Sequence, residues 1–280
     1  SFCATLLRRF PLEAGVSPQF TELDDRAARL LRENIIEDLA GFRAPDLMAD
    51  LARAYSGEDF AALMAQVAAK RAGFARHLTE TQARALFEVA DTATLETILV
   101  DVFLGAEADL ISAILPALQA GSVTDVKTAA KLAALDFAAP SLATLIAAEG
   151  IFLSGAKTKT PFVAKIDALP TKDTRRAIAD QQPQLNNLMA RVEQARGLRI
   201  RLMAAEKTAL LHRFASVFLL LYEAAKAARG VLDFDDLITR AKTLLTDASV
   251  AAWVLFRLDG GIDHILVDEA QDTSPDQWRV

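Results

Sequence analysis

Two adjacent carboxylates, Asp268 and Glu269, follow directly on the apolar segment 262–267. The segment is short and rich in β-branched and apolar residues, which predicts a buried central strand of a parallel sheet. Open α/β folds bind their ligands at the carboxyl ends of such strands. There, one carboxylate can hold Mg²⁺ through water while the second orients or deprotonates an attacking water. The pair therefore predicts metal-assisted hydrolysis of a nucleotide phosphate.

The residues after this pair make the pattern specific. Three apolar residues followed by Asp-Glu arise by chance in about one chain of this length in eight, so that pair alone favours an ordinary acidic turn. Ala270, Gln271 and Asp272 lower the chance to about one in several thousand. The longer pattern is the Walker B arrangement. A Gly-x-x-x-x-Gly-Lys-Ser/Thr phosphate loop is absent from the 280 residues, so we expect it upstream of Ser1.

Residues 266–275 resemble motif II of the UvrD/Rep/RecB branch of superfamily 1 DNA helicases, and the Asp-Glu-Ala-Gln-Asp form is similar to that of the RecB and AddA side of this branch. Residues 1–15 resemble the segment that follows motif Ib in AddA-type proteins. Residues 233–237 are similar to the helix that precedes motif II, and residues 152–154 with the lysines after them are a weaker match. These segments occur in the family's order.

The resemblance implies the architecture. The chain is expected to be a mainly α fragment, made of a large helical insertion (domain 1B) in a RecA-like α/β P-loop NTPase core (domain 1A). Only edge pieces of that core, including the Walker B strand, would be present. The expected boundaries are 1–30 for domain 1A after motif Ib, 31–230 for domain 1B, and 231–280 for the return to domain 1A.

The resemblance also implies the function. The parent protein would be an ATP-dependent DNA helicase subunit, with a possible separate exonuclease domain, acting in double-strand-break repair and recombination. Its cofactors would be ATP and Mg²⁺; Asp268 would hold the metal through water, Glu269 would be the catalytic base, and Gln271 would couple the γ-phosphate to DNA. Asp272 is interpreted as a turn residue. The isolated fragment is expected neither to hydrolyse ATP nor to unwind DNA.

Charge is distributed unevenly along the chain. The net charge of −6 argues against a protein that coats nucleic acid non-specifically, yet residues 151–215 hold 12 basic and 5 acidic residues. Duplex phosphates or ordinary solvated charge both explain this excess. The candidate DNA contacts are Lys157, Lys159, Lys165, Lys172, Arg175 and Arg176.

Two function classes stay open for the helical part. It is either a DNA-contacting arm of a motor that binds duplex and single strands, or a non-catalytic module that mainly docks a partner subunit of an AddAB-type complex. The acidic bulk of the chain supports the second class. The longest apolar run, near residues 214–222, is too short to span a bilayer, so no membrane contact and a cytoplasmic location are expected.

Apolar spacing predicts helix after helix up to a cap at Gly230, with a kink or a split at Pro116 and a break or a bend at Pro183. A helix N-terminal acidic turn explains Asp233, Asp235 and Asp236 more simply than a metal cluster does. Phe2, Cys3 and Phe10 are expected in the core, and His77 and His212 at the surface. The expected helices are 1–10, 21–39, 45–55, 58–77, 80–91, 93–120, 123–135, 141–148, 173–195, 198–228, 233–246 and 249–258.

Overall fold

The computed structural model describes residues 2–57 and 59–258, which form two compact units. The described part of the first unit consists of residues 2–57, 59–78 and 210–258, and the second unit consists of residues 79–209. Asp268, Glu269 and Gln271 lie outside the described residues.

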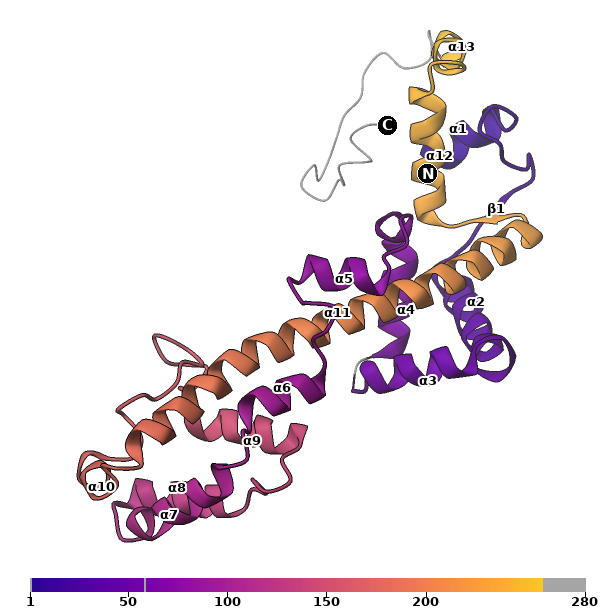
Figure 1. The fold of residues 1–280 in the computed structure, drawn as a ribbon. Helices are drawn as coiled ribbons and strands as arrows, with labels where there is room; N and C mark the ends of the chain where they lie inside the picture. The colour runs from indigo at the N-terminus through magenta and orange to yellow at the C-terminus, as the bar shows by residue number, and fades with distance from the viewer. Residues whose placement is uncertain (1, 58, 259–280) are drawn as a thin grey trace. The chain divides into compact units, whose positions relative to one another are not determined.

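Helices make up most of both units (Figure 1). The first unit contains α1 (Phe2–Arg9), β1 (Thr21–Glu22), α2 (Asp25–Asp38), a π-helical turn (Leu39–Arg43), α3 (Pro45–Ala54), α4 (Phe60–Ala69), a 3₁₀ helix (Arg71–Phe74), β2 (Val231–Leu232), α12 (Phe234–Thr246) and α13 (Ala251–Leu258). The second unit contains α5 (Glu80–Leu86), α6 (Leu95–Val102), α7 (Glu107–Gln119), α8 (Val123–Ala133), α9 (Leu142–Phe152) and α10 (Lys172–Ala177). The helix α11 (Gln182–Arg229) contributes residues to both units.

The helix α11 is one continuous helix of 48 residues, whereas the sequence predicted two helices, 173–195 and 198–228. The predicted gap between them and the predicted break at Pro183 are both wrong. Gly197 costs only about 1 kcal/mol in a helix interior. Buried residues on either side of it, including Ala195 and Leu202, pack into the core of the second unit and offset that cost. Pro183 does not break the helix, since it lies in the first turn, where a missing N–H costs nothing. Gly230, at φ +62°, follows the helix as predicted.

The expected helix 93–120 is also divided differently. It separates into α6 and α7 around Gly105, which has a φ of +97°, and not at Pro116. Pro116 lies inside α7, where Ile114 and Leu118 are both fully buried and hold the chain on either side of the proline. Packing therefore determines this boundary more strongly than the proline does.

Two short strands, which the sequence did not reveal, join the ends of the first unit. In this parallel pair, Thr21 is opposite Val231 and Glu22 is opposite Leu232. Two residues are too few to show the alternation that identifies a strand. Beside the pair, α1 and α12 pack around a core that contains Phe10 and the partly buried Cys3, as predicted. Phe2 is 53% exposed, so the prediction that it lies in the core was wrong.

Each unit has further apolar packing of its own. In the first unit, Phe214, Phe218 and Tyr222 stack along α11 against residues of α2, α3 and α4. In the second unit, α6 to α9 pack against the first half of α11. Among the described residues, α11 is the one helix long and apolar enough to cross a membrane. A core helix meets the same criteria, and because α11 supplies buried residues to two cores, it does not indicate a membrane protein.

Candidate functional site

The elements that lead toward Asp268 and Glu269 are α12 and α13. The helix α12 begins with a capping box, in which the Asp233 carboxylate accepts from the Asp236 backbone N–H at 2.9 Å and the Asp236 carboxylate accepts from the Asp233 N–H at 3.0 Å. The box satisfies two amides that a helix start otherwise leaves unpaired. This confirms the predicted acidic helix start.

Two cations bind the carboxylates of this box. The Lys226 ammonium lies 2.9 Å from Asp233, 2.7 Å from Asp236 and 2.9 Å from Glu223. The Arg71 guanidinium lies 2.9 Å from Asp233 and 2.8 Å from Asp236. We call these five side chains the ion cluster. Lys226 is only 2% exposed, so its charge depends on these partners.

The protonation of the ion cluster follows from its contacts. Burial alone would lower the pKa of Lys226, but its hydrogen bonds to Asp236, Asp233 and Glu223 outweigh burial and raise that pKa. Burial alone would raise the pKa of Asp233, but hydrogen bonds from Lys226 and the Asp236 amide lower it. Each carboxylate of the capping box thus pairs with both Lys226 and Arg71. Among the described residues, no group of three or more His, Cys, Asp or Glu side chains is placed to hold a metal ion.

The candidate DNA-contact residues lie on two neighbouring segments of the second unit. Lys157 and Lys159 are exposed on the loop between α9 and α10. The base of this loop is closed by the Leu153–Ala164 bridge, and Glu193 of α11 accepts from the Ala164 N–H at 2.8 Å. The two lysines therefore project from an ordered loop.

Lys165 has a different environment from the other candidates. Its ammonium donates to the Ile151 carbonyl at 2.7 Å, and the side chain is half-buried. Burial, together with the nearby charge of Lys131, lowers the pKa of Lys165. The structure thus gives this lysine a role in fastening the loop to α9.

Lys172, Arg175 and Arg176 come together at one hollow of about 510 Å³. We call these three residues the α10 cations. The first turn of α11 and Asp167 complete the wall of the hollow. Arg176 pairs with Asp173 at 3.3 Å on the surface, and within the described residues the buried Nε of Arg175 has no hydrogen-bond partner. Three positive side chains around one hollow suit an anionic ligand such as a phosphate.

Part of the positive excess of residues 151–215 is structural. Arg199 binds Glu149 of α9 through two hydrogen bonds of 2.9 and 2.8 Å. Arg191 binds the buried Glu107 of α7 at 2.6 Å. These arginines attach neighbouring helices to α11. By contrast, Lys172, Arg176 and the two loop lysines are exposed, and Arg175 is partly buried.

The family follows from comparison of the whole chain. The family model described as UvrD/REP helicase N-terminal domain matches residues 1–280. The chain belongs to this family. Comparisons with curated proteins and with solved structures gave no match. Membership in the UvrD/REP family implies an ATP-dependent DNA helicase that binds DNA and uses ATP and Mg²⁺.

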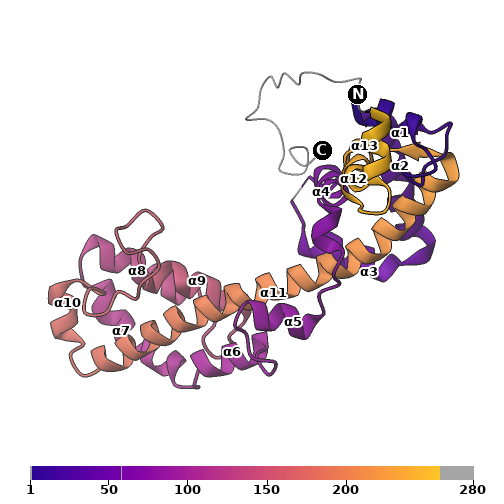
Figure 2. The same ribbon diagram turned by 90° about the horizontal axis from the view of Figure 1, so that it is seen from above.

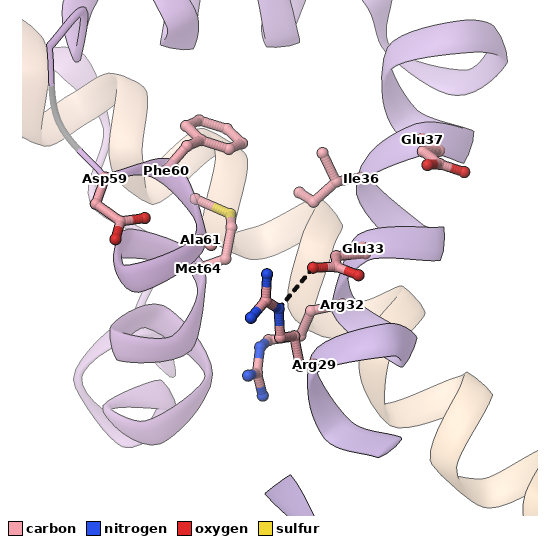
Figure 3. A pocket seen from close by; sticks show the side chains of 9 residues that line it. All are labelled: Arg29, Arg32, Glu33, Ile36, Glu37, Asp59, Phe60, Ala61 and Met64. Carbon is pink, nitrogen blue, oxygen red and sulfur yellow. Dashed lines mark hydrogen bonds and ion pairs between the residues drawn. The ribbon is translucent and has the colours of Figure 1, made fainter. Parts of the chain in front are cut away.

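A second hollow lies between α2 and α4 of this UvrD/REP domain, also about 510 Å³ in volume. Figure 3 shows Arg29 and Arg32 on its α2 side, with Arg29 paired to Glu33 at 2.8 Å, and Phe60 and Met64 on its α4 side. Because charges of both signs and apolar groups mix along the wall, the hollow has no single ligand chemistry. The α10 cations remain the best candidate contact for DNA.

The start of α10 is bound by the Asp125 carboxylate of α8. This fully buried side chain accepts from the Thr171 backbone N–H at 2.9 Å, from the Thr174 hydroxyl at 2.9 Å, and from the Thr171 hydroxyl. It also accepts from the Ser122 hydroxyl at 2.9 Å. Burial alone would raise the pKa of Asp125, but the bonds from Thr171, Ser122 and Thr174 outweigh it and lower the pKa to about 2.

This low pKa makes a pH-dependent contribution to stability. A depressed folded-state pKa stabilises the protein above the unfolded value, and the effect is lost as the pH falls through the folded value. We expect the unfolding free energy of the wild type to exceed that of Asp125→Asn by about 2 kcal/mol more at pH 6 than near pH 2. Urea unfolding of both proteins across this range measures it. If the two proteins differ in unfolding free energy by the same amount at pH 6 and near pH 2, the low pKa assigned to Asp125 is contradicted.

Proposed function

We propose that this UvrD/REP chain is the region from motif Ib to motif II of an AddA-type helicase–nuclease subunit that acts in double-strand-break repair. The Asp-Glu-Ala-Gln-Asp form of motif II supports this assignment. In this proposal, residues 31–230 form the helical domain 1B, and residues 1–30 and 231–280 belong to the RecA-like domain 1A. The parent protein is cytoplasmic, pairs with a partner subunit and carries its phosphate loop upstream.

In the parent protein, ATP hydrolysis would depend on motif II. Asp268 would hold Mg²⁺ through water, and the metal would neutralise charge on the β- and γ-phosphates. Glu269 would orient or deprotonate the attacking water, and Gln271 would couple the nucleotide to DNA contacts. Family membership supports these roles, since the family is that of ATP-dependent DNA helicases.

The helical part would contact the phosphates of duplex DNA. The observation that carries this proposal is the convergence of the α10 cations on one hollow. Lys157 and Lys159, on the loop that leads toward the same helix, would extend the contact. Charge neutralisation of this kind is independent of sequence and strongly dependent on salt.

Removing the α10 cations should weaken duplex binding in a salt-dependent way. In the variant with Lys172, Arg175 and Arg176 replaced by alanine, the negative slope of log K against log salt should become shallower by about 0.9 for each phosphate that the protein no longer neutralises. Fluorescence anisotropy with a labelled duplex, from about 50 to 200 mM salt, measures this. The matched control replaces three exposed cations of the first unit with alanine: Arg26, Lys70 and Arg76.

The outcome separates the two function classes. The control removes the same net charge, so it should keep the wild-type slope if the DNA binds locally at the hollow. Equal reductions of the slope in both variants would show only a general charge effect and would contradict DNA binding at the hollow. No duplex binding at about 50 mM salt, together with binding to a purified partner subunit, would favour a docking module instead.

A further inference from the structure

We propose that Asp125 is a positioning residue for the α10 cations, because it fastens the start of α10 to α8. The inference rests on the proposed function, in which these cations bind DNA phosphates. The Asp125 side chain is fully buried, so it cannot touch DNA itself. It would act through α10, whose first residues bond to it from 46 residues further along the chain.

The helix α10 has little else to fix its start. It has six residues, and isolated helices of that length are unstable in water. Its N-cap residue, Thr171, makes no side-chain capping bond within the helix. The Thr171 hydroxyl instead donates to the Asp125 carboxylate of α8. The Thr171 backbone N–H donates to the same carboxylate at 2.9 Å. The start of α10 is thus bonded to another helix.

A second bond fixes the rotation of α10 about its axis. Thr174 is buried, and its hydroxyl donates to Asp125 at 2.9 Å. Bonds at positions 171 and 174 hold both ends of the first turn. Arg175 and Arg176 follow Thr174 directly, so the direction in which they leave the helix depends on that turn.

Close packing against the end of α7 supports the same conclusion. Figures 1 and 2 both show α10 beside α7, and the two helices are in contact. A Cβ on Gly121, just after α7, would lie 2.5 Å from the Thr174 hydroxyl and 2.9 Å from the Asp125 carboxylate. Only glycine leaves room there for α10 to approach so closely. The position of α10 is therefore determined by close packing at Gly121 as well as by its hydrogen bonds to Asp125.

The bonds of Asp125 fall into two groups that can be removed separately. Ser122 of the α8 capping box accepts from the Asp125 N–H at 3.3 Å and donates its hydroxyl to the carboxylate at 2.9 Å. Thr171 and Thr174 supply the bonds toward α10. Thr174→Val keeps the side-chain volume and removes one bond to α10, whereas Ser122→Ala loosens α8 and leaves the bonds to α10 intact. Ser122→Ala is the matched control for a loss of stability alone.

The experiment compares both variants and Asp125→Asn with the wild-type chain. Hydrogen exchange of residues 171–178 measures how firmly α10 is held in place. The salt dependence of duplex binding measures how many phosphates the α10 cations neutralise, and the Tm measures overall stability. In Thr174→Val, exchange should rise on the order of tenfold, the expected loss for one hydrogen bond to a charged group. The negative slope of log K against log salt should become shallower, toward that of the variant without the α10 cations. Ser122→Ala should lower the Tm without either change.

Three results would overturn the proposal. One is wild-type exchange of residues 171–178 in Thr174→Val and Asp125→Asn. Another is raised exchange with an unchanged salt slope. The third is a loss of duplex binding in Ser122→Ala equal to that in Thr174→Val at the same Tm. If the wild-type chain binds no duplex, both the proposed function and the role of Asp125 in DNA contact are wrong. Raised exchange of residues 171–178 in Thr174→Val and Asp125→Asn would then show only that Asp125 holds α10 in place.

Discussion

Replacing Lys226 with methionine should lower the free energy of unfolding of the first unit by about 3–5 kcal/mol. The variant keeps the length of the side chain but removes the ammonium that lies 2.9 Å from Asp233 and 2.7 Å from Asp236. Both carboxylates are 9% exposed and would then share only the Arg71 guanidinium. The loss is large because the removed partner leaves buried charge without compensation, which costs more than the pair itself contributes.

Urea unfolding, followed by circular dichroism, measures this loss. The control is Arg229→Met, which removes an exposed cation from the same last turn of α11 and should change the free energy by less than about 0.5 kcal/mol. Adding Asp236→Asn to Lys226→Met removes one of the uncompensated charges, so the double variant should be more stable than the sum of the two single losses predicts. A loss below about 1 kcal/mol in Lys226→Met would show that the ion cluster contributes no more than an exposed pair.

The helix ends of this protein could be predicted best from its sequence. Asp233 with Asp236 and Gly230 are local signals, since each works through the backbone within a few residues. The ion cluster could not be predicted in the same way. Arg71 is 162 residues from Asp233 in the sequence, and no local pattern indicates that the 3₁₀ helix lies beside the start of α12.

The errors have a common physical cause, which is that tertiary packing outweighs local preference. The predicted gap between residues 195 and 198 does not occur in α11, and α7 continues through Pro116. In each helix, buried residues on both sides of the expected interruption keep the helix continuous. His212, expected at the surface, is partly buried and lies 4.9 Å from the Phe74 ring, and burial, together with the nearby His77, lowers its pKa. The β1–β2 pair connects residues about 210 positions apart, which a pattern in one segment does not show.

Replacing Glu269 with glutamine should reduce ATP turnover about 10²–10⁴-fold in the parent protein that carries this chain and the expected phosphate loop. Glutamine keeps the shape of the side chain but cannot accept the proton of the attacking water. DNA binding should be unaffected, because the proposed contacts lie on the second unit. Steady-state ATP hydrolysis with saturating DNA measures the effect.

Asp272→Asn is the matched control for this variant, since it removes one carboxylate three residues away that is interpreted as a turn residue. It should retain most of the turnover. Equal reductions in both variants would indicate damage to the turn and not to a catalytic base. A Glu269→Gln protein with turnover near that of the wild type would contradict the assignment of motif II.

Motif II of the candidate site could be predicted from the sequence, but the arrangement of the candidate DNA contacts could not. A motif of ten consecutive residues is informative without a structure, so Asp268 and Glu269 could be selected from residues 266–275 alone. The charge count selected six basic residues but did not distinguish among them. The structure shows the Lys165 ammonium bound to a backbone carbonyl and the α10 cations gathered at one hollow. Asp125 was missed because its bonds to α10 reach 46 residues or more along the chain.

Cross-linking of DNA to the chain tests whether duplex DNA binds at the α10 cations and the loop before them. A duplex substituted with bromodeoxyuridine would be irradiated with the 280-residue protein, and the linked peptides would be identified by mass spectrometry. We expect cross-links within residues 155–177 that disappear as the salt concentration is raised. Cross-links confined to residues 2–78 and 210–258, or none at low salt, would contradict it.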